Sequence, residues 1–145
     1  MGKKTEIKEM NLDDQQFEQM PEATPAQYIM GLLQIRDQAH IIHWQTKLEA
    51  EHRNFGMFYE DFLELVDAIV ESILGKYGTE VLAFDEAALG LVSYDGNYEG
   101  FLKMIDASCE MFYAVFDERE DSELYNELDN IKTLKNKLTY LLKQQ

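Results

Sequence analysis

The chain has 145 residues, 46% of them hydrophobic, which is the size of one globular domain with enough apolar surface for a core. Its formal net charge of −15 repels polyanions, so no nucleic-acid partner is expected. We expect neither a membrane span nor a secretory signal, because no run approaches ~18 consecutive apolar residues and the N-terminus lacks an apolar core. Cys109 is the only cysteine and cannot form an intrachain disulfide, which makes the cytoplasm the expected location.

Residues 1–23 are polar, lack a helical period and include Pro21. This composition predicts a flexible, acidic N-terminal arm. The remaining residues, 24–145, carry regularly spaced apolar positions and predict a single helical domain.

A first helix is predicted over residues 25–50. Thr24 matches an N-cap, Pro25 the first helical position and Gln27 the partner of a capping box. Apolar residues then recur every three or four positions, as on one face of an amphipathic helix. This face consists of Tyr28, Leu32, Ile35, Ala39 and Ile42, and His43 continues it.

Three more helices are predicted from the same period, over residues 53–75, 97–117 and 122–143. Gly75 and Gly78 predict the end of the first of these three. Their apolar positions are Phe55, Phe58, Phe62, Val66, Ile69 and Ile73; then Tyr98, Phe101, Ile105, Cys109, Phe112 and Phe116; then Leu124, Leu128, Ile131, Leu134, Leu138 and Leu141.

The connections between the helices constrain the topology. Only residues 118–121 join the third and fourth helices, so these two must pack as antiparallel neighbours. Residues 76–96 join the second and third helices and are long enough to cross the length of a bundle. The helix-prone segment 80–89 predicts a short extra helix in this crossover. The predicted fold is therefore all-α, a ferritin-like four-helix bundle with one long crossover between its second and third helices.

The three histidines lie within thirteen residues, from His40 to His52, which suggests a metal site. His43 would present a ring nitrogen on the inner side of the first helix. Asp67 and Glu71, at i and i+4, would place two carboxylates on one face of the second helix. Mixed nitrogen and oxygen ligands suit iron, manganese or zinc. The alternative is that His43 is a hydrogen-bonded core histidine and that both carboxylates are simply solvated.

The order His43-Trp44, then His52, then Asp67 and Glu71 resembles the starvation-induced mini-ferritins known as Dps. In that family two histidines from one subunit and an acidic pair from a two-fold-related neighbour form a shared site. Ferrous iron is oxidised at this site before it is stored in a closed shell. The resemblance implies a mono-iron or di-iron site, with manganese or zinc as other possible metals. It implies His43 and His52 as ligands on one chain, Asp67 and Glu71 on the other, and Trp44 packed beside them. It also implies a homo-oligomer, either a dimer or a larger shell.

The resemblance covers residues 26–78, and Gly56 is its main departure, because the family has an acidic residue four positions after the second histidine. The sequence therefore leaves two functions open. One is oxidation and sequestration of ferrous iron at the intersubunit site. The other is a non-catalytic ferritin-like structural or interaction protein, of cellular or viral origin, that has lost the ferroxidase chemistry. His40, three residues before His43, is predicted to be a surface or interface histidine.

Overall fold

The computed structural model describes residues 22–144, so nearly all of the predicted N-terminal arm lies outside the described residues. This part of the chain contains four α-helices, one 3₁₀ helix and no strand, which confirms the prediction of an all-α chain with four helices. None of these helices combines the length and apolarity that crossing a bilayer requires. The elements are α2 (Pro25–Gln45), α3 (Glu49–Tyr77), η1 (Thr79–Leu82), α4 (Glu99–Val115) and α5 (Ser122–Lys143).

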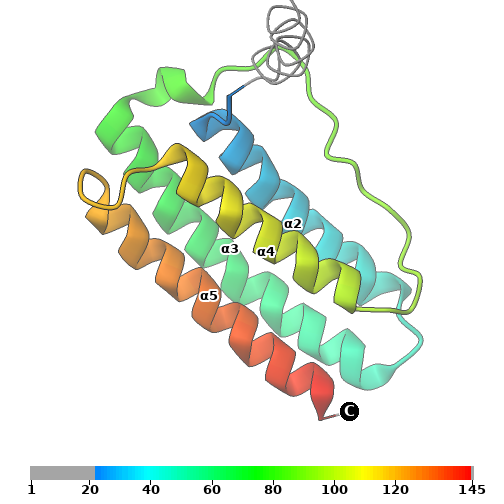
Figure 1. The fold of residues 1–145 in the computed structure, drawn as a ribbon. Helices are drawn as coiled ribbons and strands as arrows, with labels where there is room; N and C mark the ends of the chain where they lie inside the picture. Colours follow the sequence, from blue (N-terminus) through cyan, green and yellow to red (C-terminus); the bar gives the residue numbers. More distant parts are fainter. Residues whose placement is uncertain (1–21, 145) are drawn as a thin grey trace, which may run out of the picture.

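The four α-helices form a bundle in which each helix packs between two antiparallel neighbours (Figure 1). Helices α2 and α5 run in one direction, and α3 and α4 run in the other. Helix α2 contacts α3 and α4, and α5 contacts the same two helices, so α2 and α5 lie on one diagonal of the bundle. The connection from α3 to α4 runs along the length of the bundle, as the sequence predicts for a long crossover.

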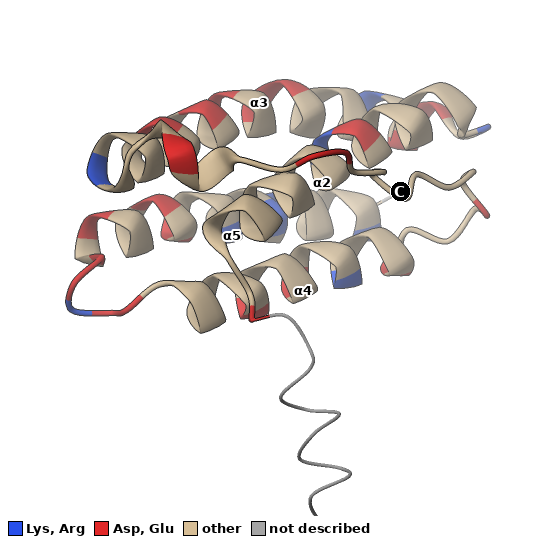
Figure 2. Cartoon of the chain, turned by 90° about the horizontal axis from the view of Figure 1, so that it is seen from above, with Lys and Arg blue, Asp and Glu red and all other residues tan. Residues whose placement is uncertain are grey.

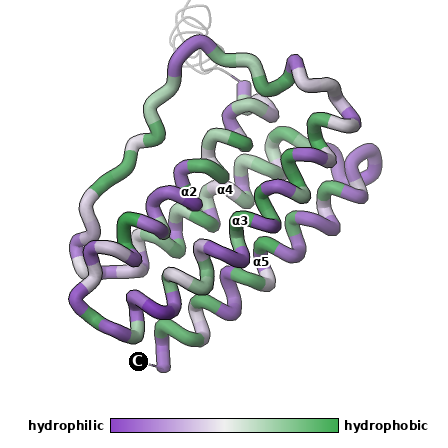
Figure 3. The backbone as a smooth tube through the Cα atoms, turned by 180° about the vertical axis from the view of Figure 1, so that it is seen from behind, coloured by the Kyte–Doolittle hydropathy of each residue, from purple (hydrophilic) through white to green (hydrophobic). Residues whose placement is uncertain are grey.

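The predicted apolar faces meet in one core. Every predicted apolar position of α2 and α3 is buried, and so are most positions of α4 and α5. The exceptions are half-buried at the edge of the core, namely Tyr98, Cys109, Leu134 and Leu141. Hydrophobic and hydrophilic residues alternate along each helix with the period that places one face inward (Figure 3).

The start of α2 confirms the predicted capping box. The Gln27 backbone amide donates to the Thr24 hydroxyl over 3.2 Å. The Thr24 backbone amide donates to the side-chain oxygen of Gln27 over 3.1 Å. Two backbone donors that the first helical turn leaves without partners are thereby satisfied.

The predicted boundary between the first two helices is wrong. Helix α2 ends at Gln45 rather than residue 50, and α3 begins at Glu49 rather than residue 53. Thr46 takes an extended conformation, and its hydroxyl accepts a hydrogen bond from the Leu48 amide at 3.2 Å. This local bond competes with the helical ladder and turns the chain.

The end of α3 is set by Gly78 and not by Gly75, which lies inside the helix. Gly78 has a φ of 92°, a backbone conformation that favours glycine over any residue with a side chain. The 3₁₀ helix η1 follows, but residues 83–98 are not helical, so the predicted helix over 80–89 is wrong beyond Leu82.

Glutamine side chains of α2 hold the crossover against the bundle. The Gln38 amide is buried, donates to the Val92 carbonyl over 2.8 Å and accepts from the Val92 amide over 2.9 Å. The Gln45 side chain likewise accepts from the Tyr94 amide over 2.7 Å. These side-chain bonds satisfy backbone N–H and C=O groups of the crossover that form no secondary-structure bonds.

The buried Asp121 closes the end of the bundle where α3 meets the turn between α4 and α5. Its carboxylate accepts hydrogen bonds from the Tyr77 hydroxyl and from the Asp117 amide, the latter at 2.9 Å. Lys76 forms an ion pair with it at 2.9 Å. The Asp121 carboxylate therefore links α3 to the N-terminus of α5.

Replacing Tyr28 by phenylalanine should raise the free energy of unfolding by about 1 kcal/mol. The Tyr28 hydroxyl is buried in the core and has no hydrogen-bond partner among residues 22–144. Burial also raises the pKa of Tyr28, so the group stays neutral. The ring would keep its edge contacts with Phe112 and Phe116, whose centroids lie 5.3 and 5.8 Å away. Urea denaturation of both proteins measures the difference.

Tyr125→Phe is the matched control, because the Tyr125 hydroxyl does have a partner. It donates to the Phe116 carbonyl over 2.8 Å, so its removal should lower stability. If Tyr28→Phe lowered stability as well, the Tyr28 hydroxyl would have a partner in solution and this prediction would be wrong.

Candidate metal centre

The structure brings His43 and His52 together across the turn between α2 and α3. Their rings stack with centroids 3.9 Å apart and planes 15° from parallel. His43 Nδ1 donates to the His52 carbonyl over 2.6 Å, and His52 Nδ1 donates to the His43 carbonyl over 2.7 Å. The His43 carbonyl lies in the last turn of α2, where helix carbonyls lack helical donors, so His52 also caps α2.

These reciprocal bonds fix which nitrogen of each ring carries hydrogen. A carbonyl oxygen can only accept, so both Nδ1 atoms must be protonated, and in the neutral rings both Nε2 atoms carry a free lone pair. No hydrogen bond to either Nε2 is found among the described residues. A ring that donates from Nδ1 to a backbone carbonyl is the usual state of a metal-binding histidine.

Gly56 provides the space that the His43 ring occupies. A Cβ atom at position 56 would lie 2.9 Å from His43 Cε1 and 3.1 Å from His43 Nδ1. Any larger residue would therefore push the ring out of its position. His43 itself is half-buried beside α3 and not part of the core that its spacing on α2 predicted.

The stacked rings cannot bind one ion together through their Nε2 atoms. Each lone pair lies in the plane of its own ring, and the two planes are nearly parallel with ring centroids 3.9 Å apart. Bonds of about 2.1 Å to a shared ion would require the lone pairs to converge. The arrangement therefore offers one nitrogen ligand to each of two positions.

Asp67 and Glu71 lie on α3 but far from the histidine pair of the same chain. Fifteen residues separate His52 from Asp67, which corresponds to about 22 Å along a helix. Both carboxylates are exposed and belong to a row of acidic residues along α3, together with Glu60 and Glu64 (Figure 2). Within residues 22–144 of a single chain, no three His, Cys, Asp or Glu side chains are placed to hold a metal ion.

His40 lies in a second aromatic cluster beside the histidine pair. Its ring contacts those of Trp44 and Tyr59 at centroid distances of 3.8 and 4.0 Å, with the planes tilted by 33° and 38°. Burial, followed by the neighbouring His43, lowers the pKa of His40 although Asp37 opposes the shift. Trp44 thus packs on His40, and 67% of its surface remains exposed. This cluster lies on the α2–α3 side of the molecule.

The sequence did not predict the roles of Glu51 and Tyr94, which organise this region. Glu51 is buried, and its carboxylate accepts hydrogen bonds from the hydroxyls of Thr46 and Tyr94. One local signal was present: Thr46 precedes the start of α3, and its hydroxyl accepts from the amide of Leu48, the N-cap of α3. No local signal pairs Glu51 with Tyr94, because 43 residues separate them.

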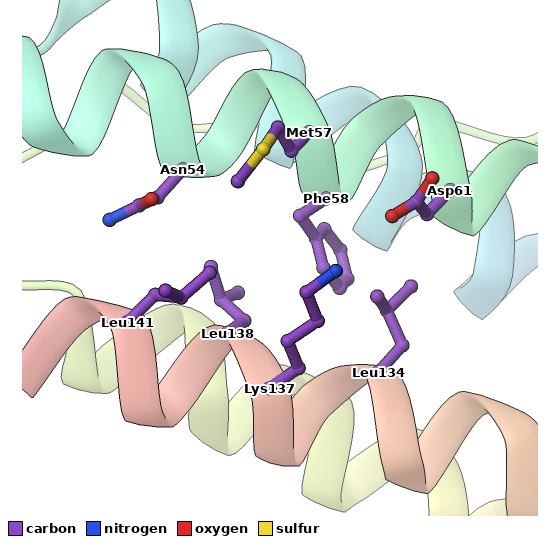
Figure 4. Close-up of a pocket in the computed structure, with 8 residues that line it drawn as sticks. All are labelled: Asn54, Met57, Phe58, Asp61, Leu134, Lys137, Leu138 and Leu141. Atoms are coloured by element: carbon purple, nitrogen blue, oxygen red, sulfur yellow. The ribbon is translucent and has the colours of Figure 1, made fainter.

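Two grooves on the described part of the chain add no further histidine to the pair. The groove between α3 and α5 has a volume of about 10 Å³, room for about one water molecule, with Met57 and Asp61 facing Leu134 and Lys137 (Figure 4). A larger groove of about 450 Å³ between α2, the crossover and α4 is mostly apolar. Neither contains a histidine.

Comparison with known proteins assigns the chain to a family without assigning a function. No curated protein and no solved structure gives a significant match. Residues 43–142 match a family of unknown function that is designated DUF5856. The matched range begins at His43 and includes His52, Asp67 and Glu71. Because it covers more than half of the sequence, the chain belongs to this family of unknown function.

Proposed function

We propose that this protein is a divergent relative of the Dps mini-ferritins that binds ferrous iron at a site shared by two copies of the chain and oxidises it. His43 and His52 of one copy and Asp67 and Glu71 of the other are the ligands in this proposal. Ferrous iron is the substrate, and each ion loses one electron to dioxygen or peroxide, which is reduced in turn. The oxidised iron is then sequestered by the assembly.

The observation that carries the proposal is the reciprocal hydrogen bonding of His43 and His52. It holds both rings in one tautomer, orients them and leaves both Nε2 atoms available. A neutral nitrogen from each ring and a carboxylate from Asp67 or Glu71 would give each of two ions mixed ligands, which suits iron, with manganese and zinc as alternatives. The near-parallel rings favour two ion positions over one.

The separation of the two halves of the site supports a shared centre. About 22 Å of α3 lies between His52 and Asp67, so one chain cannot close the site. In a two-fold dimer, any contact from the histidine end of one α3 to the acidic end of the other occurs twice. The neighbour order of the helices and the long crossover between α3 and α4 support a ferritin-like bundle as the framework.

A second candidate function rests on Gly56 and on the same hydrogen bonds. The reciprocal bonds also tie α2 to α3, which is a structural task that needs no metal. Gly56 leaves the region without the carboxylate that the mini-ferritins have at that position. The competing proposal is therefore a non-catalytic bundle whose α2–α3 side mediates structural or partner contacts.

Complementation between two variants tests the shared site. One variant carries His43→Ala and His52→Ala, and the other carries Asp67→Asn and Glu71→Gln. Neither should bind ferrous iron alone under anaerobic conditions, and neither should develop ferric absorbance when oxygen is admitted. After the two are refolded together, random pairing should restore about a quarter of the wild-type sites, because only mixed dimers contain an intact one.

Helical content and solution mass of every sample provide the controls. Iron binding by either variant alone would exclude the shared ligand set. An unmodified protein that binds no iron and shows no ferric absorbance would remove the ferroxidase proposal and favour the non-catalytic bundle. A monomer of unmodified protein at micromolar concentration would exclude any site that needs two copies.

A further inference from the structure

A buried carboxylate adjoins the histidine pair. Glu51 is 3% exposed and directly precedes His52. Its Oε1 atom accepts a hydrogen bond from the Thr46 hydroxyl at 2.7 Å and another from the Tyr94 hydroxyl at 3.0 Å. Thr46 belongs to the turn between α2 and α3, whereas Tyr94 belongs to the crossover, so the carboxylate joins two segments that are distant in sequence.

Tyr94 contacts both sides of that turn. Its backbone amide donates to the Gln45 side chain over 2.7 Å, at the last residue of α2. Its hydroxyl reaches Glu51 in the first turn of α3, and its ring lies 6.5 Å from the ring of Phe55. Tyr94 thus holds the end of one helix and the start of the next in a fixed relation.

The histidine pair depends on this relation. His43 lies two residues before Gln45, and His52 follows Glu51, so a change in the turn moves the two rings relative to each other. The rings are held by hydrogen bonds of 2.6 and 2.7 Å and by a close approach to Gly56. A displacement of about 1 Å would lengthen these bonds to about 3.6 Å or more, beyond the range of a hydrogen bond.

We propose that Tyr94 is a positioning residue for the His43–His52 pair and that it acts through the carboxylate of Glu51. The crossover thereby sets the geometry of the candidate metal centre without contributing a ligand. The consequence for metal binding rests on the proposed function, whereas the consequence for ring geometry does not. Burial, followed by the hydrogen bond to Glu51, raises the pKa of Tyr94, which keeps its hydroxyl protonated as a donor.

Tyr94→Phe removes the hydroxyl and keeps the ring. The imidazole ¹⁵N chemical shifts of the metal-free variant report whether His43 and His52 keep hydrogen on Nδ1. We expect both residues to shift toward a mixture of tautomers, because the bonds that select one tautomer are weakened. Thr46→Val removes the other hydroxyl donor to the same oxygen and should move the same signals, so the test does not depend on one variant.

Tyr125→Phe is the matched control, since it also removes a hydrogen-bonded tyrosine hydroxyl, but at the α4–α5 end of the bundle. It should leave the His43 and His52 signals unchanged. Ferrous iron affinity should fall about 10-fold or more in Tyr94→Phe and stay unchanged in Tyr125→Phe.

The outcomes separate the two proposals. Unchanged histidine signals in both Tyr94→Phe and Thr46→Val would overturn the positioning role, whatever the protein binds. An equal shift in Tyr125→Phe would reduce the effect to general loss of stability and overturn it too. Shifted signals in a protein that binds no iron would support the positioning role and remove the proposed function alone.

Discussion

Asp121→Asn is expected to lower the free energy of unfolding by about 2 to 3 kcal/mol at neutral pH, because it removes the charge from a buried acceptor that three donors share. The Asp121 carboxylate accepts from the Tyr77 hydroxyl and from the Asp117 amide, and it pairs with Lys76 at 2.9 Å. An amide presents one acceptor oxygen and brings two donors of its own. It therefore cannot satisfy all three partners, and urea denaturation should show the loss.

The loss should depend on pH. Burial alone would raise the pKa of Asp121, but hydrogen bonds from Tyr77, Lys76 and the Asp117 amide outweigh burial and hold the pKa below its ordinary value. A carboxyl group whose pKa is lowered on folding stabilises the folded state above its unfolded pKa and stops doing so below its folded pKa. The difference between wild type and Asp121→Asn should thus be full at pH 7 and close as the pH falls below about 4.

Glu123→Gln is the matched control for this prediction. Glu123 pairs with the same Lys76 at 2.7 Å, but its side chain is half exposed. Exposed ion pairs contribute little, so this variant should unfold close to wild type. Equal losses in both variants, or a difference that persists unchanged at pH 3, would show that the buried carboxylate of Asp121 does not close the bundle as described.

Gly56→Ala is expected to weaken the proposed iron binding about 10-fold or more, because the added methyl group displaces the His43 ring. The new Cβ atom would meet His43 Cε1 at 2.9 Å, closer than such contacts allow. The ring would lose its stacking on His52 and the 2.6 Å hydrogen bond to the His52 carbonyl. The stability lost with these contacts should offset the gain of about 1 kcal/mol that alanine normally gives over glycine in a helix interior.

Gly75→Ala separates the helix effect from the site effect. Gly75 also lies in α3, and a Cβ atom there would meet nothing within 4 Å. This variant should be more stable than Gly56→Ala by about 1 to 2 kcal/mol and should bind iron like wild type. If Gly56→Ala bound iron normally and gained the same stability as Gly75→Ala, the His43 ring would be free to move and the described pair would not hold the ligands.

For the candidate site, the sequence supplied the residue types and the structure supplied their arrangement. The mini-ferritin resemblance implied that His43 and His52 act together on one chain, and their rings do meet between α2 and α3. Their stacking and the role of Gly56 could not be predicted, because both depend on the distance between the two helix axes. Asp67 and Glu71 were predicted on one face of α3, and their distance from His52 follows from the sequence spacing once both lie on one helix.

The fold likewise has features that the sequence determines and features that only the tertiary structure decides. The two kinds differ in how far apart along the chain the interacting residues lie. The sequence by itself determined the apolar faces of the four helices, the cap at Thr24 and the tight connection before α5, since each depends on residues within about four positions of one another. Only the tertiary structure decided what is fixed by contacts across many residues, namely Gln38 with Val92, Glu51 with Tyr94 and Asp121 with Tyr77. These polar groups are buried because distant segments supply their partners, and a local pattern contains no information about a partner that the folded chain brings from more than forty residues away.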